Sequence, residues 1–164
     1  MSTYRIGTSR DIHRLVPDRP LWIGGILIPF ERGFEAHSDG DIVLHALTEA
    51  LLGALALGDL GTHFPNTDMK YKDQSSSYFV KYADRKVRDA GFIICNIDIQ
   101  ITMEQPKLNP YIPQMIACIA TILSLAPDQI SIKAGTNEGL GYIGQGLAGE
   151  AQCVVLIEKQ THLI

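Results

Sequence analysis

One helical segment, residues 41–57, is apolar on almost every side. Asp39 or Asp41 can cap its start, because a carboxylate accepts hydrogen bonds from the free N–H groups of a first helical turn, and Gly58 can end it. The apolar side chains of this segment are Ile42, Val43, Leu44, Leu47, Leu51, Leu52 and Leu55. A helix with so little polar surface has to lie at the centre of a fold or be covered by a partner subunit.

The chain is long enough to supply a core for such a helix. Its 164 residues correspond to one domain of ordinary size, and folding at that length buries roughly 70% of the surface of the unfolded chain. The composition agrees, since 46% of the residues are hydrophobic and 20% are charged, which is typical of a globular protein. Repeats, linkers and low-complexity runs are absent, so residues 1–164 are predicted to form a single domain.

No segment is predicted to cross a membrane or to be removed as a targeting signal. The most apolar stretch, residues 50–58, is much shorter than the ~20 residues that a membrane-spanning helix requires. The N-terminus lacks the apolar core of a signal peptide, so we expect the mature protein to start at or near Met1. The formal net charge of −4 argues against nonspecific binding to nucleic acid or to an anionic membrane surface.

The cysteines indicate a reducing compartment. Cys95, Cys118 and Cys153 are odd in number, widely spaced and surrounded by apolar residues. Disulfides persist in oxidising compartments, whereas thiols stay reduced in the cytosol. We therefore expect buried structural thiols in a cytoplasmic protein.

The remaining sequence alternates between strand-like and helix-like patterns. Phe92–Thr102 alternates in polarity, as does a strand with one polar face. Its apolar face is predicted to hold Ile93, Cys95, Ile97, Ile99 and Ile101, and its polar face Asn96, Asp98, Gln100 and Thr102. The other predicted elements are a short strand at residues 4–7, a hairpin or bulge at residues 21–29 around Gly24 and Gly25, helices at residues 75–91 and 110–125, and strands at residues 130–134 and 150–158. This order predicts an α/β (α+β) sandwich in which helices pack on one face of a mixed β-sheet.

Asp11 and His13 follow the first predicted strand with one residue between them. Side chains two apart in an extended chain point the same way, so this carboxylate and imidazole can converge on one ion. His45 belongs to the polar stripe of the apolar helix, which consists of Asp41, His45, Thr48 and Glu49. Two interpretations stay open: His45 is a core histidine satisfied by a carboxylate, or it is the third ligand of an Asp/His/His site. Three protein ligands with one open position are typical of catalytic zinc.

Two further segments carry polar side chains on loops. The turn before the apolar helix contains His37 and Ser38, where backbone N–H groups and the helix dipole can bind an anion. A plain capping loop is the alternative. The glycine-rich loop at residues 135–146 has neither the phosphate-loop nor the dinucleotide-binding spacing. Its candidate functional side chains are Thr136 and Glu138, on a backbone that can approach phosphates closely.

Together these segments cover nearly the whole chain, and they resemble the 2-C-methyl-D-erythritol 2,4-cyclodiphosphate synthase family of the non-mevalonate isoprenoid pathway. Specific short motifs carry the resemblance. They are Arg5-Ile6-Gly7, Asp11-Ile12-His13, His37-Ser38-Asp39-Gly40-Asp41 through His45 to Gly53, Asp59-Leu60-Gly61, Phe64-Pro65-Asn66-Thr67-Asp68, Pro106-Lys107-Leu108, Ile112-Pro113-Gln114-Met115, and Lys133-Ala134 with Thr136 and Glu138.

The resemblance implies an enzyme that works as a homotrimer, with active sites between adjacent subunits. It implies one zinc or other divalent ion per subunit on Asp11, His13 and His45, and Mg²⁺ or Mn²⁺ near Glu138. The implied substrate is the small nucleotide diphosphate 4-diphosphocytidyl-2-C-methyl-D-erythritol 2-phosphate. Its 2-phosphate attacks the β-phosphate, which closes a cyclic diphosphate and expels CMP.

The resemblance also implies roles for individual residues. His37 and Thr136 are expected to stabilise the transition state by hydrogen bonding. Residues 103–109 are expected to hold the cytidine end, largely through backbone groups, while residues 59–61 and 64–68 line the erythritol pocket. The expected substrate-binding residues are Ser38, Asp59, Leu60, Gly61, Phe64, Pro65, Asn66, Thr67, Asp68, Met103, Glu104, Gln105, Pro106, Lys107, Leu108, Asn109, Gly135, Asn137, Tyr142 and Gln145.

Some positions depart from the family's usual pattern. Arg10 stands where an apolar residue is common, and Glu49 replaces the usual aspartate. Gly135 and Asn137 stand where threonines are frequent. Gln145 occupies an often basic position near the central cavity of the trimer. The implied metal ligands are unchanged.

Two other functions fit the same residues. A zinc-dependent phosphohydrolase would use the open metal position to activate water, and it would release inorganic phosphate. A trimeric binding protein would hold a structural metal, for which a closed fourth ligand is expected. His63 and His162 lie outside the matched segments, so no fourth ligand is obvious in the sequence.

Overall fold

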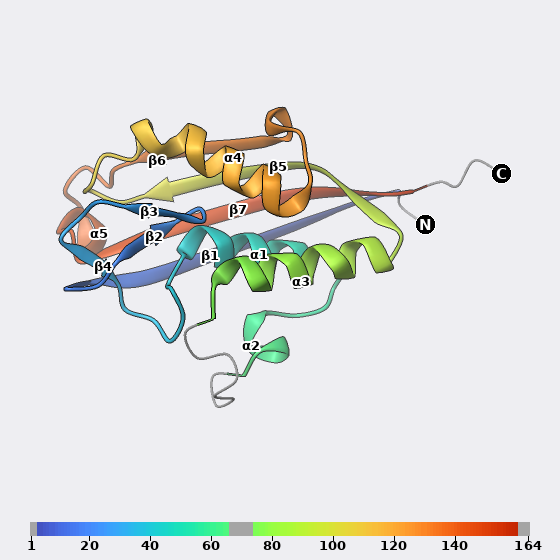
Figure 1. Cartoon of the computed structure of the whole chain (residues 1–164), viewed down its shortest axis with the longest axis horizontal. Coiled ribbons are helices and arrows are strands. Elements are labelled where there is room, and N and C mark those ends of the chain that lie inside the picture. Colours follow the sequence, from blue (N-terminus) through green and yellow to red (C-terminus); the bar gives the residue numbers. More distant parts are fainter. Residues whose placement is uncertain (1–2, 66–73, 161–164) are drawn as a thin grey trace.

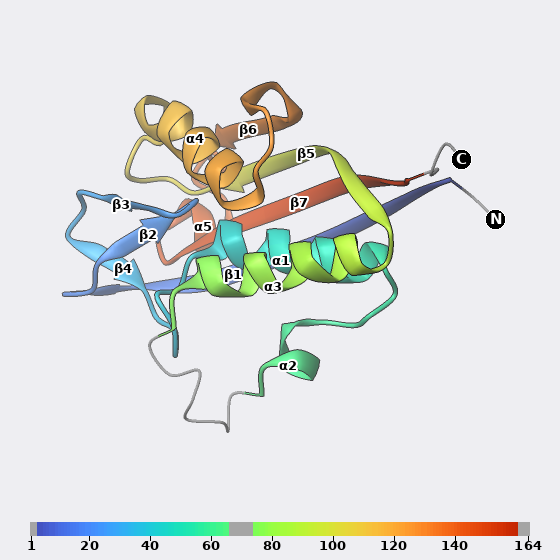
Figure 2. The same ribbon diagram turned by 45° about the vertical axis from the view of Figure 1, so that its right-hand side comes forward.

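A computed structural model describes residues 3–65 and 74–160, which form two layers (Figure 1, Figure 2). One layer is a five-stranded sheet with the strand order β4-β1-β7-β5-β6. Its strands are β1 (Tyr4–Pro17), β4 (Arg32–Phe34), β5 (Phe92–Thr102), β6 (Ile130–Gly135) and β7 (Ala148–Lys159). A separate hairpin joins β2 (Leu21–Ile23) to β3 (Ile26–Ile28) at the predicted glycine pair.

The longer helices form the second layer and pack on one face of the sheet (Figure 2). They are α1 (Ile42–Ala54), α3 (Ser76–Asp89) and α4 (Ile112–Leu123). The single-turn helix α2 (Leu60–His63) lies beyond α3, and α5 (Gly141–Gly144) lies at the end of the sheet where β7 begins (Figure 2). Two 3₁₀ turns are at Asn109–Tyr111 and Pro127–Gln129. Among the described residues, no helix combines the length and apolarity needed to cross a bilayer.

The sheet is mixed, as predicted. β1 pairs antiparallel with β4 and β7, and β7 pairs antiparallel with β5. β5 and β6 are parallel, and parallel neighbours need a crossover connection. The segment that contains α4 makes this crossover, and it keeps α4 on the same side of the sheet as α1 and α3 (Figure 2).

Helix α1 lies at the centre of the molecule, as its all-round apolar sequence predicts. Only His45, Glu49 and Gly53 of this helix are not buried. A Cβ at Gly7 of β1 would lie 1.8 Å from the backbone oxygen of Ala50, so the helix rests directly on the strand backbone. The helix ends at Ala54 rather than near residue 57, because the chain already turns away in the three residues before Gly58.

Strand β1 is much longer than the predicted strand at residues 4–7. Its eleven pairs with β7 run from Tyr4 to Arg14, and its last residues pair with β4. Asp11 and His13 therefore lie within a strand rather than after one. Long-range pairing extends the strand through a segment whose local pattern is too polar to indicate it.

A bulge in β5 changes the predicted faces of this strand. The register with β7 shifts between Ile94 and Asn96, which leaves Cys95 without an opposite residue. A bulge reverses the alternation on one side of itself. Ile94 is consequently buried and Ile93 is 38% exposed, so the prediction that Ile93 and Cys95 face the core is wrong.

The expectation of buried thiols holds for one cysteine of three. Cys153 is buried in the core, whereas Cys95 and Cys118 are half-buried, and all three are free. The bulge takes Cys95 out of the core-facing row. Cys118 lies on α4 against the glycine turn of the hairpin, with Sγ 3.6 Å from the carbonyl oxygen of Gly25.

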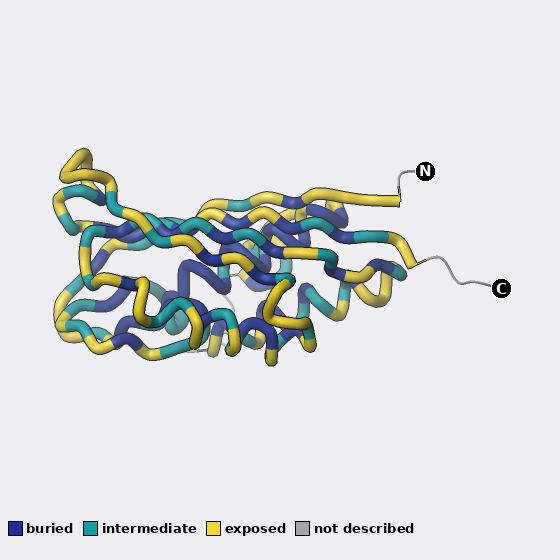
Figure 3. Tube along the Cα trace, turned by 90° about the horizontal axis from the view of Figure 1, so that it is seen from above, coloured by how far each residue is buried: buried dark blue, intermediate teal, exposed yellow. Residues whose placement is uncertain are grey.

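No described helix covers the opposite face of the sheet (Figure 3). Ile6 of β1 is 70% exposed there and Val154 of β7 is 45% exposed. The same face carries the ion pair between Lys133 and Asp98, at 2.6 Å. We call this surface the open face.

Candidate metal centre and substrate pocket

The structure brings the three predicted metal ligands together. Asp11 and His13 lie two residues apart on β1 and point toward α1, which carries His45. One ligand atom from each residue lies within 4.8 Å of the others. Asp11 Oδ2 is 3.1 Å from His13 Nε2 and 3.0 Å from His45 Nδ1. Because α1 rests on the backbone of Gly7, the helix is close enough for His45 to reach the strand.

The donor set fits a divalent ion. The second nitrogen of His13, Nδ1, lies 3.0 Å from the carbonyl oxygen of Glu35. A carbonyl only accepts, so a neutral His13 carries its proton on Nδ1 and turns the lone pair of Nε2 toward Asp11. One carboxylate oxygen and two imidazole nitrogens form a typical zinc donor set with a position left open. Among the described residues, the group holds no fourth histidine, cysteine or carboxylate.

Burial and the mutual contacts of the three side chains shift the pKa values of Asp11 and His13 in opposite directions. Burial raises the pKa of Asp11, but the interactions with His13 and His45 outweigh it and leave that pKa below its usual value. Burial lowers the pKa of His13, but the adjacent Asp11 carboxylate outweighs it and leaves that pKa above its usual value. A divalent ion therefore has to displace a proton that Asp11 favours on His13.

Aromatic rings flank the cluster while leaving it accessible. The ring centroids of His13 and Phe34 are 6.1 Å apart, and those of His45 and Phe79 are 6.3 Å apart. The side chains of Asp11, His13 and His45 are 23%, 19% and 12% exposed. The site is thus partly shielded from water, which strengthens electrostatic interactions within it.

The turn before α1 lies against the cluster. Ser38 Oγ is 3.3 Å from His45 Nε2, and His37 is exposed. Arg19 braces the turn by donating to the carbonyl oxygens of Ala36 and Ser38. Asp41, rather than Asp39, caps α1: its carboxylate accepts from the N–H groups of Val43 and Leu44 and from the two glycines of the hairpin turn.

A pocket of ≈ 120 Å³ lies at the β6 edge of the sheet. It joins part of the predicted cytidine-binding segment to the start of the glycine-rich loop. Its lining residues are Met103, Pro106, Lys107, Leu108, Asn109, Ala134, Gly135 and Thr136. Ala134 is the one lining residue that the sequence reasoning did not assign to the site. The peptide bond between Gln105 and Pro106 is cis.

The glycine-rich loop is organised by its own hydrogen bonds. Thr136 Oγ1 donates to Glu138 Oε1 over 2.8 Å. The backbone N–H of Asn137 donates to Glu104 Oε1 over 2.8 Å, which ties this loop to the predicted cytidine-binding segment. Gln145 and Tyr142 are exposed and do not line the pocket. The Tyr142 hydroxyl accepts a hydrogen bond from Arg10.

The predicted erythritol-binding segment is anchored near the metal centre. Glu49 accepts from Ser9 Oγ over 2.7 Å and from the N–H of Leu60 over 3.2 Å, so it links β1, α1 and α2. The Asp59 carboxylate caps α2 by accepting from the N–H and hydroxyl of Thr62. Gly61 lies on this exposed helix.

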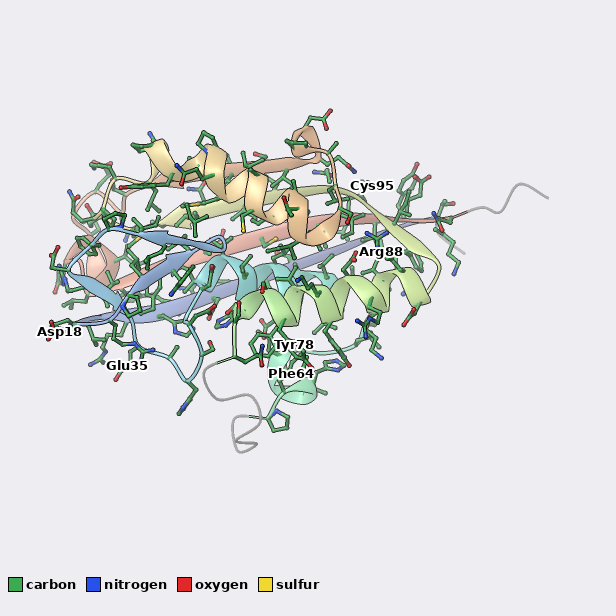
Figure 4. The ribbon with its side chains drawn as sticks, in the orientation of Figure 1. Asp18, Glu35, Phe64, Tyr78, Arg88 and Cys95 are labelled. Carbon is green, nitrogen blue, oxygen red and sulfur yellow. The ribbon has the colours of Figure 1, made fainter. Side chains whose placement is uncertain are left out.

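Phe64 is packed among aromatic rings. Its ring centroid lies 4.7 Å from that of Phe79, 4.9 Å from that of Tyr82 and 6.0 Å from that of Tyr78, all on α3. Figure 4 shows Phe64 beside Tyr78. Pro65 follows it and is exposed. The predicted residues Asn66, Thr67 and Asp68 lie outside the described residues.

The metal cluster and the pocket are separate in one chain. Ile12 of β1 pairs with Glu150 of β7, Glu150 pairs with Thr102 of β5, and Thr102 pairs with Gly135 of β6. Three strand spacings of about 4.8 Å place these two strands roughly 14 Å apart. The ligands also face α1, whereas the pocket lies at the sheet edge.

Several polar residues around the cluster were not assigned to it by sequence reasoning. They are Ser9, Glu35, Glu49 and Ser76, together with Asp39, which was considered only as a helix cap. Glu49 could have been found from its place on the polar stripe of α1. The contact of Ser76 with the cluster has no sequence signal, because 31 residues separate it from His45.

Comparison with known proteins identifies the family of the chain. A family model described as the YgbB family matches residues 4–158. A 2-C-methyl-D-erythritol 2,4-cyclodiphosphate synthase of Burkholderia mallei is 48% identical over 96% of this chain and 98% of its own. The enzyme of the same name from Laribacter hongkongensis is 46% identical over 92% of this chain and 94% of its own.

Solved structures show the same fold. The CDP complex of IspF from Plasmodium falciparum matches with a TM-score of 0.87 and 32% identity, over 98% of this chain and 99% of that one. The bifunctional IspDF of Campylobacter jejuni matches with a TM-score of 0.92 and 39% identity. This match covers 96% of the present chain but 42% of the bifunctional chain. The chain belongs to the YgbB family, whose matched curated members are named 2-C-methyl-D-erythritol 2,4-cyclodiphosphate synthases.

Proposed function

We propose that this chain converts 4-diphosphocytidyl-2-C-methyl-D-erythritol 2-phosphate into 2-C-methyl-D-erythritol 2,4-cyclodiphosphate and CMP, a step of isoprenoid precursor biosynthesis. The convergence of Asp11, His13 and His45 on one point, with an open fourth position, carries the proposal. The family membership and the names of the relatives supply the reaction.

The reaction is an intramolecular phosphoryl transfer. An oxygen of the 2-phosphate forms a bond to the β-phosphorus, and the bond from that phosphorus to the oxygen bridging to the α-phosphate breaks. CMP leaves with the electron pair of the broken bond. The nucleophile is already an anion, so no side-chain base has to remove a proton. The task of the protein is to bring two anionic groups together and to stabilise the charge that develops.

The residues of the cluster and the loop are suited to this task. A divalent ion held by Asp11, His13 and His45 supplies a Lewis acid for the phosphate oxygens. His37 and Thr136 donate hydrogen bonds to the reacting phosphates, and Thr136 gives up its hydrogen bond to Glu138 Oε1 to do so, since a hydroxyl has one proton. Glu138 would hold Mg²⁺ or Mn²⁺, since a hard cation prefers carboxylate oxygen.

The cytidine end of the substrate occupies the pocket at the β6 edge. A relative in this family has been solved with CDP, which contains the same nucleoside and diphosphate. Met103 and Leu108 are buried and supply apolar surface, and Thr136 at the rim supplies a hydroxyl. The pocket therefore orients the leaving group beside the glycine-rich loop.

The active site is shared between subunits of a homotrimer. In one chain the metal cluster and the nucleotide pocket lie on strands roughly 14 Å apart, at three strand spacings of about 4.8 Å. A neighbouring subunit of the trimer supplies the nucleotide pocket that works with this metal cluster. The free cysteines fit a cytoplasmic enzyme.

Incubation with the diphosphocytidyl substrate tests the proposal. The purified protein with Zn²⁺ and Mg²⁺ should release CMP and form the cyclic diphosphate in equal amounts, as followed by ³¹P NMR. Release of inorganic phosphate instead of a cyclic product would identify a phosphohydrolase. Tight binding without turnover would identify a binding protein.

A further inference from the structure

The outer nitrogen of His45 contacts a hydroxyl that is itself bound by a carboxylate. His45 Nε2 lies 2.9 Å from Ser76 Oγ, and Ser76 Oγ donates to Asp39 Oδ1. The backbone N–H of Ser76 donates to the other oxygen of Asp39 over 2.9 Å. These contacts join the turn before α1, the first residue of α3 and the metal-binding helix.

The direction of each hydrogen bond follows from the number of protons. A serine hydroxyl has one proton, and an ionised carboxylate only accepts, so Ser76 donates to Asp39. Ser76 Oγ can then only accept from His45, which places a proton on Nε2. A neutral imidazole with its proton on Nε2 carries its lone pair on Nδ1. Nδ1 is the atom that faces Asp11, at 3.0 Å.

Ser76 is well placed to enforce this arrangement. Its exposed fraction is 0%, so water does not compete for the hydroxyl. Ser38 is a weaker partner, because its Oγ lies 3.3 Å from Nε2 and also accepts from the N–H of Gly40 over 3.2 Å.

We propose that Asp39 and Ser76 are positioning residues that hold His45 in the tautomer whose Nδ1 can bind a divalent ion. The inference rests on the metal site of the proposed function, but it does not depend on the reaction carried out there. Outer partners of this kind typically change metal affinity by 10–100-fold.

The first test reads the tautomer directly. In the metal-free wild-type protein at pH 8, ¹H–¹⁵N spectra of the imidazole rings should show neutral His45 with its proton on Nε2. The resonances of His45 are assigned by their loss in His45→Gln. A neutral His45 with its proton on Nδ1 in the wild-type protein overturns the proposal.

The second test reverses the hydrogen bonds while keeping the shape of the site. In Asp39→Asn, one amide oxygen replaces two acceptors, and it should keep the shorter backbone contact, with the N–H of Ser76 at 2.9 Å, rather than the contact with the N–H of Asp41 at 3.2 Å. The amide NH₂ then faces Ser76 Oγ. The hydroxyl of Ser76 then donates to His45 Nε2, and the proton of the ring moves to Nδ1. Zinc affinity, measured by competition with a chromogenic chelator, should fall about 10–100-fold, and the NMR spectra should show the changed tautomer.

Serine variants complete the design. Ser76→Ala removes the hydroxyl and should weaken zinc binding to a similar extent. Ser75→Ala is the matched control, because Ser75 is exposed and makes no side-chain capping bond on α3, and it should keep wild-type affinity. If Ser76→Ala does not fold, the tautomer of His45 in the wild-type protein and the zinc affinity of Asp39→Asn still test the proposal.

The outcomes separate this inference from the proposed function. Wild-type zinc affinity and an unchanged His45 tautomer in Asp39→Asn overturn the inference, even if the enzyme turns over its substrate. A protein that binds zinc with the expected dependence on Asp39 but makes no cyclic diphosphate overturns the proposed function alone.

Discussion

At the scale of single residues, the metal centre is defined by one shared oxygen. Asp11 Oδ2 faces a nitrogen of His13 and a nitrogen of His45 at 3.1 and 3.0 Å. Neutral rings with their protons on the outer nitrogens present lone pairs to this oxygen, and three lone pairs repel one another unless a proton or a metal ion lies between them. The cluster is thus suited to a cation, and protons and a metal ion would compete for it.

Replacing His45 tests this cluster most directly. His45→Ala should lose roughly one equivalent of zinc per chain and abolish turnover, because Asp11 and His13 alone are too few ligands for tight binding. Elemental analysis gives the zinc content. His63→Ala is a suitable control, since His63 bonds to Tyr82 and Leu57 instead. Wild-type zinc content and activity in His45→Ala would restore the interpretation of a satisfied core histidine.

Replacements of Thr136 and Glu138 in the glycine-rich loop should have different effects on the kinetics. Glu138→Gln keeps an amide oxygen that can accept from Thr136 Oγ1, so it removes charge with little change of shape. It should leave zinc content intact, lower activity and raise the Mg²⁺ concentration needed for half-maximal rate. Thr136→Ala should lower kcat on the order of 10²-fold with little change in Mg²⁺ dependence. Steady-state kinetics at varied Mg²⁺ separates the two effects.

These two variants also test whether the loop takes part in the reaction. A loss of zinc in Glu138→Gln would contradict the separate roles assigned here. Wild-type kinetics of both variants at limiting Mg²⁺ would make the loop structural.

At the scale of elements, the centre depends on the contact between α1 and β1. This contact is close because Gly7 has no side chain: a Cβ there would lie 1.8 Å from Ala50 O and 2.7 Å from Ala54 N. The strand supplies two ligands and the helix supplies the third. The spacing between the two elements therefore sets whether the three ligand atoms can meet on one ion.

A methyl group at Gly7 should disturb both the fold and the metal site. Gly7→Ala has to push α1 away from β1, which typically costs about 1–3 kcal/mol of unfolding free energy. The same shift moves His45 away from Asp11, so zinc affinity should fall as well. Urea unfolding of the metal-free protein and a zinc titration measure the two effects.

The same helix supplies the control for this experiment. A Cβ at Gly53 meets nothing within 4 Å, so Gly53→Ala should increase stability by up to about 1 kcal/mol and leave zinc binding unchanged. Equal behaviour of the two alanine variants would contradict the role given to Gly7.

At the scale of the whole molecule, one face of the sheet lacks a covering layer in the described chain (Figure 3). Ile6 and Val154 present apolar side chains on this open face. Monomers seldom leave contiguous apolar surface in water, and such surface commonly marks an interface. The proposed homotrimer would bury this surface.

A charge on the open face should break this assembly without harming the metal centre. Light scattering of the wild-type protein should give about three times the chain mass of 18.0 kDa. Val154→Asp should lower the mass and abolish turnover while zinc binding persists, because one chain supplies all three ligands. Leu27→Asp on the hairpin is the control and should remain trimeric. An active monomer would contradict the shared site.

Much of the secondary structure could be predicted from local patterns. The helices beginning at Ile42 and Ser76 and the glycine turn of the hairpin lie where periodicity, caps and positive φ angles require them. Strands were less predictable, since their limits depend on distant partners. The long pairing of β1 with β7 and the bulge before Asn96 in β5 are examples.

The sequence by itself determined the chemistry of the candidate site. It placed Asp11 and His13 two residues apart in extended chain and set His45 on the polar stripe of an apolar helix, because those patterns depend on neighbours within one turn or one strand. Only the tertiary structure decided that one oxygen of Asp11 lies beside a ring nitrogen of each histidine, and that Ser76 and Asp39 lie next to the outer nitrogen of His45. Contacts across 31 or more residues depend on how the elements pack, and no local periodicity records that packing.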